Sequence, residues 1–420
     1  MTMINKLNFK NLFFNSRKQI VYGNDESKKY FIKIQIEKNK NKTNDITKEY
    51  EIIVNLNEAE CISCPKAYEI GKINKDDFYS IVDQKEVLDG IKDSEFTYIL
   101  QEYIPDSDEG ELADMLFSMI EQKRLGVYQG DLKPENLRFD SSKSICYIVD
   151  YDQAILLDKD LIELDNTRFI DFCSEYDKEK YGIGDWLRHF PQYTKDDVLS
   201  LFRSNALDLS RTTIFNMQNT TNTPDGMYHT ISEKDIFMDA ARTLDARGKL
   251  LYGLSFKEGE KVLDIGCNAG LLSMYLHDRG CSVTGVDNDS RIVLASKMIS
   301  NILGKKINYY QQDLDFVEEL ETFDTIMLFS VFHHTRNLSE NGIKVANSCS
   351  RIIIETRLNE NGGKQPGEDG VWRISNDFSW KFNNLQDLTS FCETIFRGFK
   401  FNKNLGIGDK SRYILEFVKE

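Results

Sequence analysis

A short apolar run followed by two glycines is the feature that most constrains the fold of this 420-residue chain. The run covers residues 261–265 and leads through Gly266 and Gly270 into LLSMYL, a predicted helix. A buried strand that turns through glycines into a helix is typical of parallel α/β sheets with a ligand at the turn. Glycine lets the ligand approach backbone that side chains would otherwise screen. The sequence therefore predicts a ligand-binding α/β domain in the C-terminal half.

The spacing of the glycines separates two classes of cofactor. A dinucleotide-binding turn reads GxGxxG, but Asn268 and Leu271 occupy the positions of its second and third glycines. Asp264 and the two glycines instead fit DxGxxxG, which favours S-adenosylmethionine over NAD. The next predicted strand, CSVTGVD, ends at Asp287, 23 residues beyond Asp264. A carboxylate placed there can accept hydrogen bonds from the two ribose hydroxyls of the cofactor.

The C-terminal half, from about Met227 to Glu420, resembles the class I methyltransferase family. The resemblance implies a Rossmann-like, seven-stranded, mostly parallel sheet that closes with an antiparallel pair of strands. It also implies that Asp313, in YYQQDLDF, contacts the adenine amino group, and that FDTIMLFSVFHH runs into the methyl-transfer site. The residues expected to contact the cofactor are Asp264, Gly266, Cys267, Asn268, Gly270, Asp287, Asn288 and Asp313.

Two histidines, His333 and His334, follow the fourth predicted strand of this half, at the edge where open α/β sheets place their ligands. One of them could deprotonate a hydroxyl acceptor, because an unperturbed imidazole titrates at about pH 6.5. An anionic phosphate acceptor would need no base. The alternative is that the pair orients a loop or binds substrate by hydrogen bonds. Arg357, after the fifth strand, is either a partner for an anionic acceptor or a solvated surface charge.

The N-terminal half carries a second constellation of polar residues, in YQGDLKPENLRF and the following SICYIVDYD. Phosphoryl transfer requires the three groups found there. Asp131 would orient the attacking hydroxyl and accept its proton, while Asn136 and Asp150 would hold magnesium on the ATP phosphates. Upstream, Lys33 lies in the predicted strand YFIKIQI, where its ammonium group can pair with the α and β phosphates.

This half, from about Phe9 to Tyr193, resembles the protein-kinase-like superfamily, and DLKPEN is a specific six-residue match. The resemblance implies a bilobal α+β domain that binds ATP and Mg²⁺. It also implies that a glutamate on a helix orients Lys33. Glu49, in EYEII, is favoured over Glu51 for this role, and Glu102 joins the expected nucleotide contacts.

The sequence departs from that superfamily at several positions. Gln129 replaces the usual histidine of the catalytic loop, and the metal-binding DFG reads Asp150, Tyr151 and Asp152. Neither a phosphate-covering glycine loop nor an APE motif is visible. A domain of about 200 residues without a peptide platform favours a sugar, lipid-linked saccharide or small alcohol as substrate, as in the atypical sugar and lipopolysaccharide kinases. The alternative is a pseudokinase.

Composition limits the partners and the compartment. The chain has 53 Lys and Arg against 68 Asp and Glu, and the resulting charge of −15 opposes binding to nucleic acid or anionic lipid. No apolar run reaches the roughly 18 residues that span a bilayer, and the start lacks the apolar stretch of a signal peptide. We therefore expect a cytoplasmic protein whose membrane association, if any, is peripheral and through its substrate. Cys61 and Cys64 form a close pair without further ligands at zinc spacing, which predicts structural thiols.

The sequence predicts a kinase-like domain over residues 1–210, a linker over 211–226 and a methyltransferase domain over 227–420. This pairing resembles the bifunctional enzymes that end O-antigen chains by phosphorylating the terminal sugar and methylating that phosphate, although the domain order is reversed and no coiled coil is evident. We expect phosphorylation of a sugar, glycolipid or polysaccharide hydroxyl, then methylation of the product or a nearby hydroxyl, because tethering raises the effective concentration of the intermediate. The alternatives are a methyltransferase with a regulatory pseudokinase and a nucleic-acid methyltransferase, which would need a basic stripe.

Overall fold

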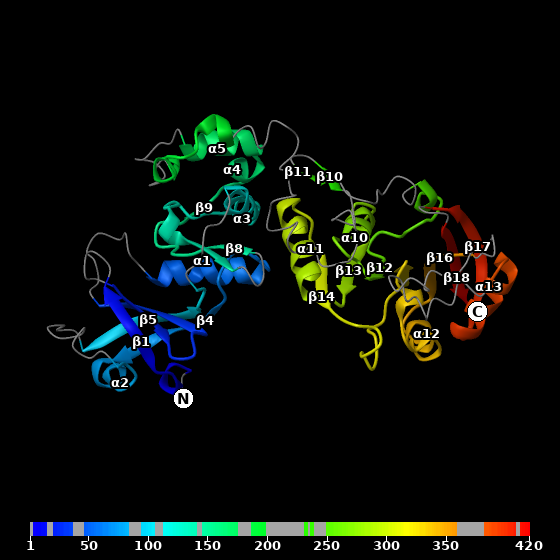
Figure 1. The fold of residues 1–420 in the computed structure, drawn as a ribbon, viewed down its shortest axis with the longest axis horizontal. Coiled ribbons are helices and arrows are strands. Elements are labelled where there is room, and N and C mark those ends of the chain that lie inside the picture. The colour runs from blue at the N-terminus through cyan, green and yellow to red at the C-terminus, as the bar shows by residue number, and fades with distance from the viewer. Residues whose placement is uncertain are drawn as a thin grey trace, which may run out of the picture. The chain divides into compact units, whose positions relative to one another are not determined.

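The chain folds into two compact units, which are described separately (Figure 1). Unit 1 consists mainly of residues 1–216 and unit 2 mainly of residues 217–420. The computed structural model describes residues 3–14, 20–36, 46–83, 94–105, 112–140, 145–174, 186–198, 231–233, 236–238, 249–358, 382–408 and 412–420. The predicted linker, residues 211–226, lies outside the described residues.

Unit 1 begins with an antiparallel sheet of the order β1-β2-β3-β5-β4. Its strands are β1 (Phe9–Phe14), β2 (Ile20–Asp25), β3 (Tyr30–Gln35), β4 (Ala67–Asn74) and β5 (Glu95–Glu102). Successive strand residues point to opposite faces, so Val21 and Leu100 join the apolar cluster on one face, while Ile20 and Ile99 join the cluster on the other. The first cluster packs against η1 (Ile4–Lys6) and α2 (Lys75–Ser80), and the second against α1 (Ile46–Glu58).

A mainly helical part of unit 1 follows β5. Its elements are α3 (Leu112–Arg124), β6 (Val127–Tyr128), η3 (Pro134–Asn136), β7 (Leu137–Asp140), β8 (Ile145–Ile148), β9 (Ile155–Leu156), α4 (Lys159–Glu163), α5 (Asn166–Ser174) and η4 (Trp186–His189). Residues 114–123 of α3 are all buried, and the helix packs against β8. β6 pairs with β9 and β7 with β8, so the loop after β6 and the loop after β8 lie side by side.

Unit 2 is built on one seven-stranded sheet of the order β14-β13-β12-β15-β16-β18-β17. The strands are β12 (Lys261–Ile265), β13 (Ser282–Asp287), β14 (Asn308–Gln311), β15 (Thr325–Phe329), β16 (Arg351–Arg357), β17 (Phe399–Ile407) and β18 (Arg412–Lys419). The first five strands in this order are parallel, and β18 is antiparallel to both of its neighbours. The predicted seven-stranded, mostly parallel sheet with a closing antiparallel pair is therefore confirmed.

Helices connect the parallel strands of unit 2. They are α10 (Leu271–His277), α11 (Ser290–Ile302), η6 (Phe332–His334), α12 (Leu338–Asn347) and α13 (Leu385–Ile395), and a small hairpin, β10 (Ile231–Glu233) with β11 (Ile236–Met238), precedes the sheet. All five residues of β15 are buried, as expected for a parallel strand covered on both faces. The strand order reverses between β12 and β15, and ligands of open α/β sheets bind at the carboxyl ends of the strands at such a switch point.

The eight cysteines of the chain are all described, buried and free of disulfides. Burial raises the pKa of Cys61 well above its usual range, and its Sγ lies 3.5 Å from Glu121 Oε2. Thiols held in this protonated state behave as small apolar core groups. Among the described helices, none combines the length and the apolar character needed to cross a bilayer.

Candidate functional site

Two glycines shape the turn between β12 and α10, at the carboxyl edge of the unit 2 sheet. The φ angle is +73° at Gly266 and +79° at Gly270, a conformation that other residues rarely adopt. A Cβ added at Gly266 would lie 2.8 Å from Val331 Cγ2, and one added at Gly270 would collide with Tyr309 Oη. Both positions therefore require glycine, which is the physical reason for the DxGxxxG spacing.

The Asp287 carboxylate lies beside this turn, at the end of β13. Its Oδ2 accepts a hydrogen bond of 3.1 Å from the Asn268 N–H, and its Oδ1 accepts one of 3.2 Å from the Asp289 N–H. Burial raises the pKa of Asp287, and the backbone donors offset this only in part. Because β12 and β13 are parallel neighbours, the structure brings the glycine turn and the predicted ribose-binding carboxylate to one edge.

The remaining predicted cofactor residues differ in exposure. Asp264 is 1% exposed, and its Oδ2 accepts a hydrogen bond of 2.6 Å from Ser273 Oγ, so this carboxylate ties β12 to α10 beneath the turn. Cys267 is also buried and offers only backbone to a ligand. Asn288 is exposed and Asp313 half-buried, and they follow β13 and β14 at the same edge of the sheet as the turn.

A polar cluster that no sequence motif indicated lies at the ends of β15 and β16. Ser330 has a φ of +60°, a strained conformation for a residue with a side chain. Its hydroxyl donates to Glu355 Oε2 and accepts from Arg412 Nη1, and Arg412 Nη1 lies 3.6 Å from Glu355 Oε2. Glu355 is completely buried. The only signal in the sequence is a glutamate within the apolar strand RIIIETR.

The loop after β15 carries the predicted histidines. His334 is exposed at the end of η6, whereas the side chain of His333 lies outside the described part of the structure. The Asp315 carboxylate accepts hydrogen bonds of 2.9 and 3.0 Å from the Arg336 N–H and therefore holds this loop against the one after β14. Arg357 is half-buried at the end of β16.

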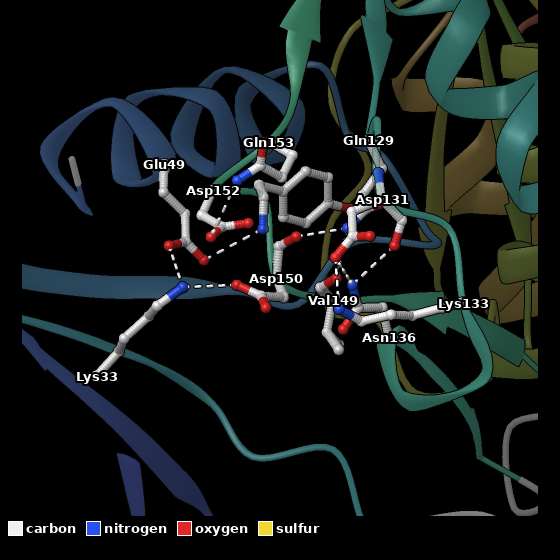
Figure 2. A network of polar contacts seen from close by, with 11 residues as sticks. Lys33, Glu49, Gln129, Asp131, Lys133, Asn136, Val149, Asp150, Asp152 and Gln153 are labelled. Carbon is white, nitrogen blue, oxygen red and sulfur yellow. Dashed lines mark hydrogen bonds and ion pairs between the residues drawn. The ribbon is translucent and has the colours of Figure 1, made fainter. Parts of the chain in front are cut away.

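In unit 1, Lys33 joins two of the predicted carboxylates (Figure 2). Its Nζ lies 2.5 Å from Glu49 Oε2 and 2.6 Å from Asp150 Oδ1, and its side chain is 2% exposed. Burial acts to lower the pKa of Lys33, but the charges of Asp150 and Glu49 outweigh it and raise the pKa well above its usual value. The partner on α1 is Glu49, while Glu51 is exposed.

The predicted catalytic loop forms a compact network around Asp131 (Figure 2). Asn136 Nδ2 donates a hydrogen bond of 2.9 Å to the Asp131 carbonyl oxygen, and Lys133 Nζ lies 2.5 Å from Asp131 Oδ2. Gln129, the departure from histidine, connects this loop to the next one: its Oε1 accepts from the Asp131 N–H at 2.8 Å, and its Nε2 donates to the Asp150 carbonyl oxygen at 2.5 Å.

The segment predicted to bind the metal has two further features. Asp150 has a φ of +65°, which is unusual for a residue with a side chain. Burial and the neighbouring Asp150 charge raise the pKa of Asp152 to about 6. Within the described residues, no group of three His, Cys, Asp or Glu side chains could hold a metal ion by itself. A metal at Asn136 and Asp150 would therefore need ligands from a bound phosphate group.

Two cavities of unit 1 contain the predicted nucleotide contacts. The larger, about 590 Å³, is lined by Lys33, Glu49, Asn136 and Asp150 among others. The smaller, about 330 Å³, is lined by Glu102 and the residues that follow it. The structure thus brings together the predicted lysine, the predicted helix glutamate and both residues predicted to bind the metal in one cavity, whereas Asp131 does not line it.

Comparison with known proteins identifies part of unit 2. A family described as "Methyltransferase domain" matches residues 262–351. The ubiquinone biosynthesis O-methyltransferase of Dechloromonas aromatica (strain RCB) is 30% identical over 97 residues, 23% of this chain and 40% of the relative. That of Rickettsia akari (strain Hartford) is 26% identical over 136 residues, 32% of this chain and 53% of the relative. The chain therefore spans less than two thirds of the length of each of these relatives.

Solved structures give weaker matches of the same kind. A methyltransferase from Aquifex aeolicus that is described as SAM-dependent is 18% identical. The match covers 42% of this chain and 92% of that protein, with a TM-score of 0.34. Magnesium protoporphyrin IX methyltransferase from Synechocystis PCC 6803 with bound SAH is 23% identical. The match covers 42% of this chain and 78% of that protein, with a TM-score of 0.30. From the family match and the sequence relatives, the C-terminal region contains a class I, S-adenosylmethionine-dependent methyltransferase domain, as predicted.

Proposed function

We propose that unit 2 binds S-adenosylmethionine between the turn after β12 and Asp287, and transfers its methyl group to an oxygen atom of an acceptor. The observation that carries this proposal is the glycine turn held beside a half-buried carboxylate. The fit is supported by Gly266 and Gly270, where any side chain would collide with Val331 or Tyr309. The sequence relatives are named O-methyltransferases, which supports oxygen as the accepting atom.

The residues of unit 2 would bind and orient, while the bound cofactor would supply an electrophilic methyl group. Asp287 would accept hydrogen bonds from the ribose hydroxyls, and these donors would offset the burial that raises its pKa. Asp313 would accept from the adenine amino group. Ser330 ends the strand on the other side of β12 and would face the acceptor. A hydroxyl acceptor would give its proton to His334 or His333, whereas a phosphate oxygen needs no base.

Cofactor binding by the full chain tests this proposal directly. We expect Asp287→Ala to weaken S-adenosylmethionine binding by about 10- to 100-fold, since hydrogen bonds to a charged group contribute about 1.5–3 kcal/mol. Asp76→Ala, an exposed change on α2, is the control and should leave the dissociation constant unchanged. Titration calorimetry measures both. Equal affinities of wild type and Asp287→Ala would refute the proposed site.

For unit 1 we propose a phosphotransferase that uses ATP and Mg²⁺, supported by the Lys33, Glu49, Asn136 and Asp150 side chains in one cavity. The acceptor oxygen would form a bond to the γ-phosphorus, the bond to ADP would break, and the hydroxyl proton would pass to Asp131. Lys33 would pair with the ATP phosphates. Asn136 and Asp150 fit Mg²⁺, which is commonly bound by one or two protein oxygens plus phosphates.

The two activities together suggest one substrate. We propose a sugar, glycolipid or polysaccharide hydroxyl that unit 1 phosphorylates and unit 2 then methylates, on the new phosphate or on a nearby hydroxyl, in modification of a surface polysaccharide. The charge of −15 disfavours nucleic acid as an alternative substrate. A lipid-linked acceptor would place a cytoplasmic protein at the membrane surface only through its substrate.

A coupled assay separates this scheme from a regulatory, non-catalytic unit 1. The chain is supplied with ATP, Mg²⁺, methyl-labelled cofactor and cell-envelope glycolipid. We expect Asp131→Ala to abolish phosphate transfer and to reduce methyl incorporation strongly. Undiminished methylation in Asp131→Ala would refute the sequential scheme and leave the methyltransferase intact. Magnesium-independent ATP binding without turnover, unaffected by Asp150→Asn, would instead establish a pseudokinase.

A further inference from the structure

Two arginines lie directly opposite each other at the carboxyl edge of the unit 2 sheet. Arg357 is the last residue of β16, and the antiparallel register of β16 and β18 pairs it with Arg412. Residues opposite each other in such a pair share one face of the sheet, with Cβ atoms about 4.5–5.5 Å apart, and like charges at these positions repel. Two adjacent cations are therefore an unfavourable arrangement for the protein by itself.

One carboxylate lies beside the two arginines. Glu355 is two residues before Arg357 on β16, so it lies on the same face of the sheet. It is completely buried, and its Oε2 lies 3.6 Å from Arg412 Nη1. The Arg412 side chain is 12% exposed, so little water is available to solvate its charge. The two arginines and the glutamate together carry one net positive charge, which favours an anionic ligand.

This cluster lies beside the turn that we propose binds the cofactor. Arg412 Nη1 donates to the Ser330 hydroxyl, which donates to Glu355 Oε2. Ser330 has a φ of +60°, and strain of this kind is concentrated at functional sites. The next residue, Val331, packs so closely on Gly266 that a Cβ added there would lie 2.8 Å from its Cγ2. A ligand of the arginines would therefore lie near the cofactor, on the side of β12 away from β13.

We infer that Arg357 and Arg412 bind a phosphate monoester group of the methyl acceptor. The inference rests on the proposed methyl transfer by unit 2 and adds which group of the acceptor this unit recognises. A guanidinium group is a planar fork that donates two parallel hydrogen bonds to an oxyanion. One fork occupies both oxygens of a carboxylate, whereas the three terminal oxygens of a phosphate monoester can accept from two forks. A neutral acceptor would not offset the repulsion between the two cations.

Binding of small sugars to the full chain, saturated with S-adenosylhomocysteine and without Mg²⁺, tests this inference. The probes are glucose 1-phosphate, glucuronate and glucose, which carry a phosphate monoester, a carboxylate and no anion on similar rings. Ligand-observed NMR measures their dissociation constants. We expect the wild type to bind glucose 1-phosphate at least about tenfold more tightly than the other two, and Arg357→Gln to weaken that binding by about tenfold.

The control and a second variant separate ligand binding from folding. Arg397→Gln removes an exposed arginine that precedes β17 at the opposite edge of the same sheet, and it should keep the wild-type affinities. Arg412→Gln alone would leave Glu355 as a buried charge without its cation, so it is combined with Glu355→Gln. This double variant should also lose the preference for glucose 1-phosphate. Arg357→Lys keeps the charge without the fork and should bind with intermediate affinity.

The outcomes distinguish this inference from the proposal beneath it. The inference is overturned if a wild type that binds S-adenosylhomocysteine binds glucose 1-phosphate no more tightly than glucuronate or glucose. It is also overturned if Arg357→Gln keeps the wild-type preference, or if it weakens all three sugars equally, as a purely structural change would. A wild type that does not bind S-adenosylhomocysteine would instead refute the proposed cofactor site, and the same titrations without it would still decide the role of the arginines.

Discussion

The side-chain amide of Gln129 joins two loops of unit 1 through its two ends: Nε2 donates to the Asp150 carbonyl oxygen at 2.5 Å, and Oε1 accepts from the Asp131 N–H at 2.8 Å. An amide carries both a donor and an acceptor, which is the combination that this bridge requires. The residue is 1% exposed, so water does not compete for these bonds. The departure from histidine at this position is therefore compatible with an ordered loop at the proposed active site.

Removing this bridge should affect phosphate transfer more than nucleotide binding. In Gln129→Ala, the Asp131 N–H and the Asp150 carbonyl lose their partners, and we expect turnover to fall at least tenfold with little change in KM for ATP. The free energy of unfolding should fall by about 1–3 kcal/mol. Steady-state kinetics and urea denaturation measure the two effects. Gln129→Glu places a buried charge against the Asp150 carbonyl oxygen and should therefore destabilise the fold at least as much; full activity in Gln129→Ala would contradict the positioning role.

Lys33 should be a large contributor to stability as well as to phosphate binding. Lys33→Met leaves Glu49, which is 1% exposed, as a buried charge without its cation, and should lower the free energy of unfolding by about 3–5 kcal/mol. Adding Glu49→Gln should recover much of this loss. Lys72→Met removes an exposed ion pair with Glu95 and should cost less than about 1 kcal/mol. If the two lysine variants lose the same stability, the buried pair is not what stabilises unit 1.

Asp152 should make unit 1 less stable as the pH rises. Its pKa is raised to about 6 in the folded chain by burial and by Asp150, against about 3.9 in an unfolded chain. The folded state therefore binds the proton more tightly, and stability falls as the pH rises from about 4 to about 6. The Asp152 carboxylate is partly solvated. The free energy of unfolding should therefore fall by on the order of 1–2 kcal/mol, less than the full change in pKa would give. Melting temperatures of wild type and Asp152→Asn across this range should diverge, with the asparagine variant more stable at pH 7; parallel curves would count against the raised pKa.

The glycine turn of unit 2 offers a test with a rescue. Gly270→Ala forces a side chain into a left-handed conformation and against Tyr309 Oη, so we expect weaker cofactor binding and a lower melting temperature. Tyr309→Phe removes the hydroxyl that the new Cβ would meet, although it also removes the contact with Ser300. The double variant should therefore bind S-adenosylmethionine better than Gly270→Ala alone. Calorimetry on the three variants measures this; an unimpaired Gly270→Ala would show that the turn tolerates a side chain.

The sequence by itself determined the features that depend on local chemistry. The left-handed backbone at Gly266 and Gly270 excludes other residues, so the spacing of these two glycines in the sequence predicts the turn. The apolar runs of the parallel strands and the acidic residue at the end of β13 are also visible in short stretches of sequence. The predicted sheet followed from them. The resemblance favoured Glu49 over Glu51, and Glu49 lies on the buried face of α1 with residues such as Ile52 and Ile53.

Only the tertiary structure decided which distant residues meet. Lys33 pairs with Asp150, 117 positions away, and Arg412 reaches Ser330, 82 positions away. No local pattern marks these contacts, because a buried ion pair forms only after strands and loops from separate parts of the chain have packed. The walls of the larger cavity, which join Lys33 and Asp150 with Arg138, likewise arise from packing alone.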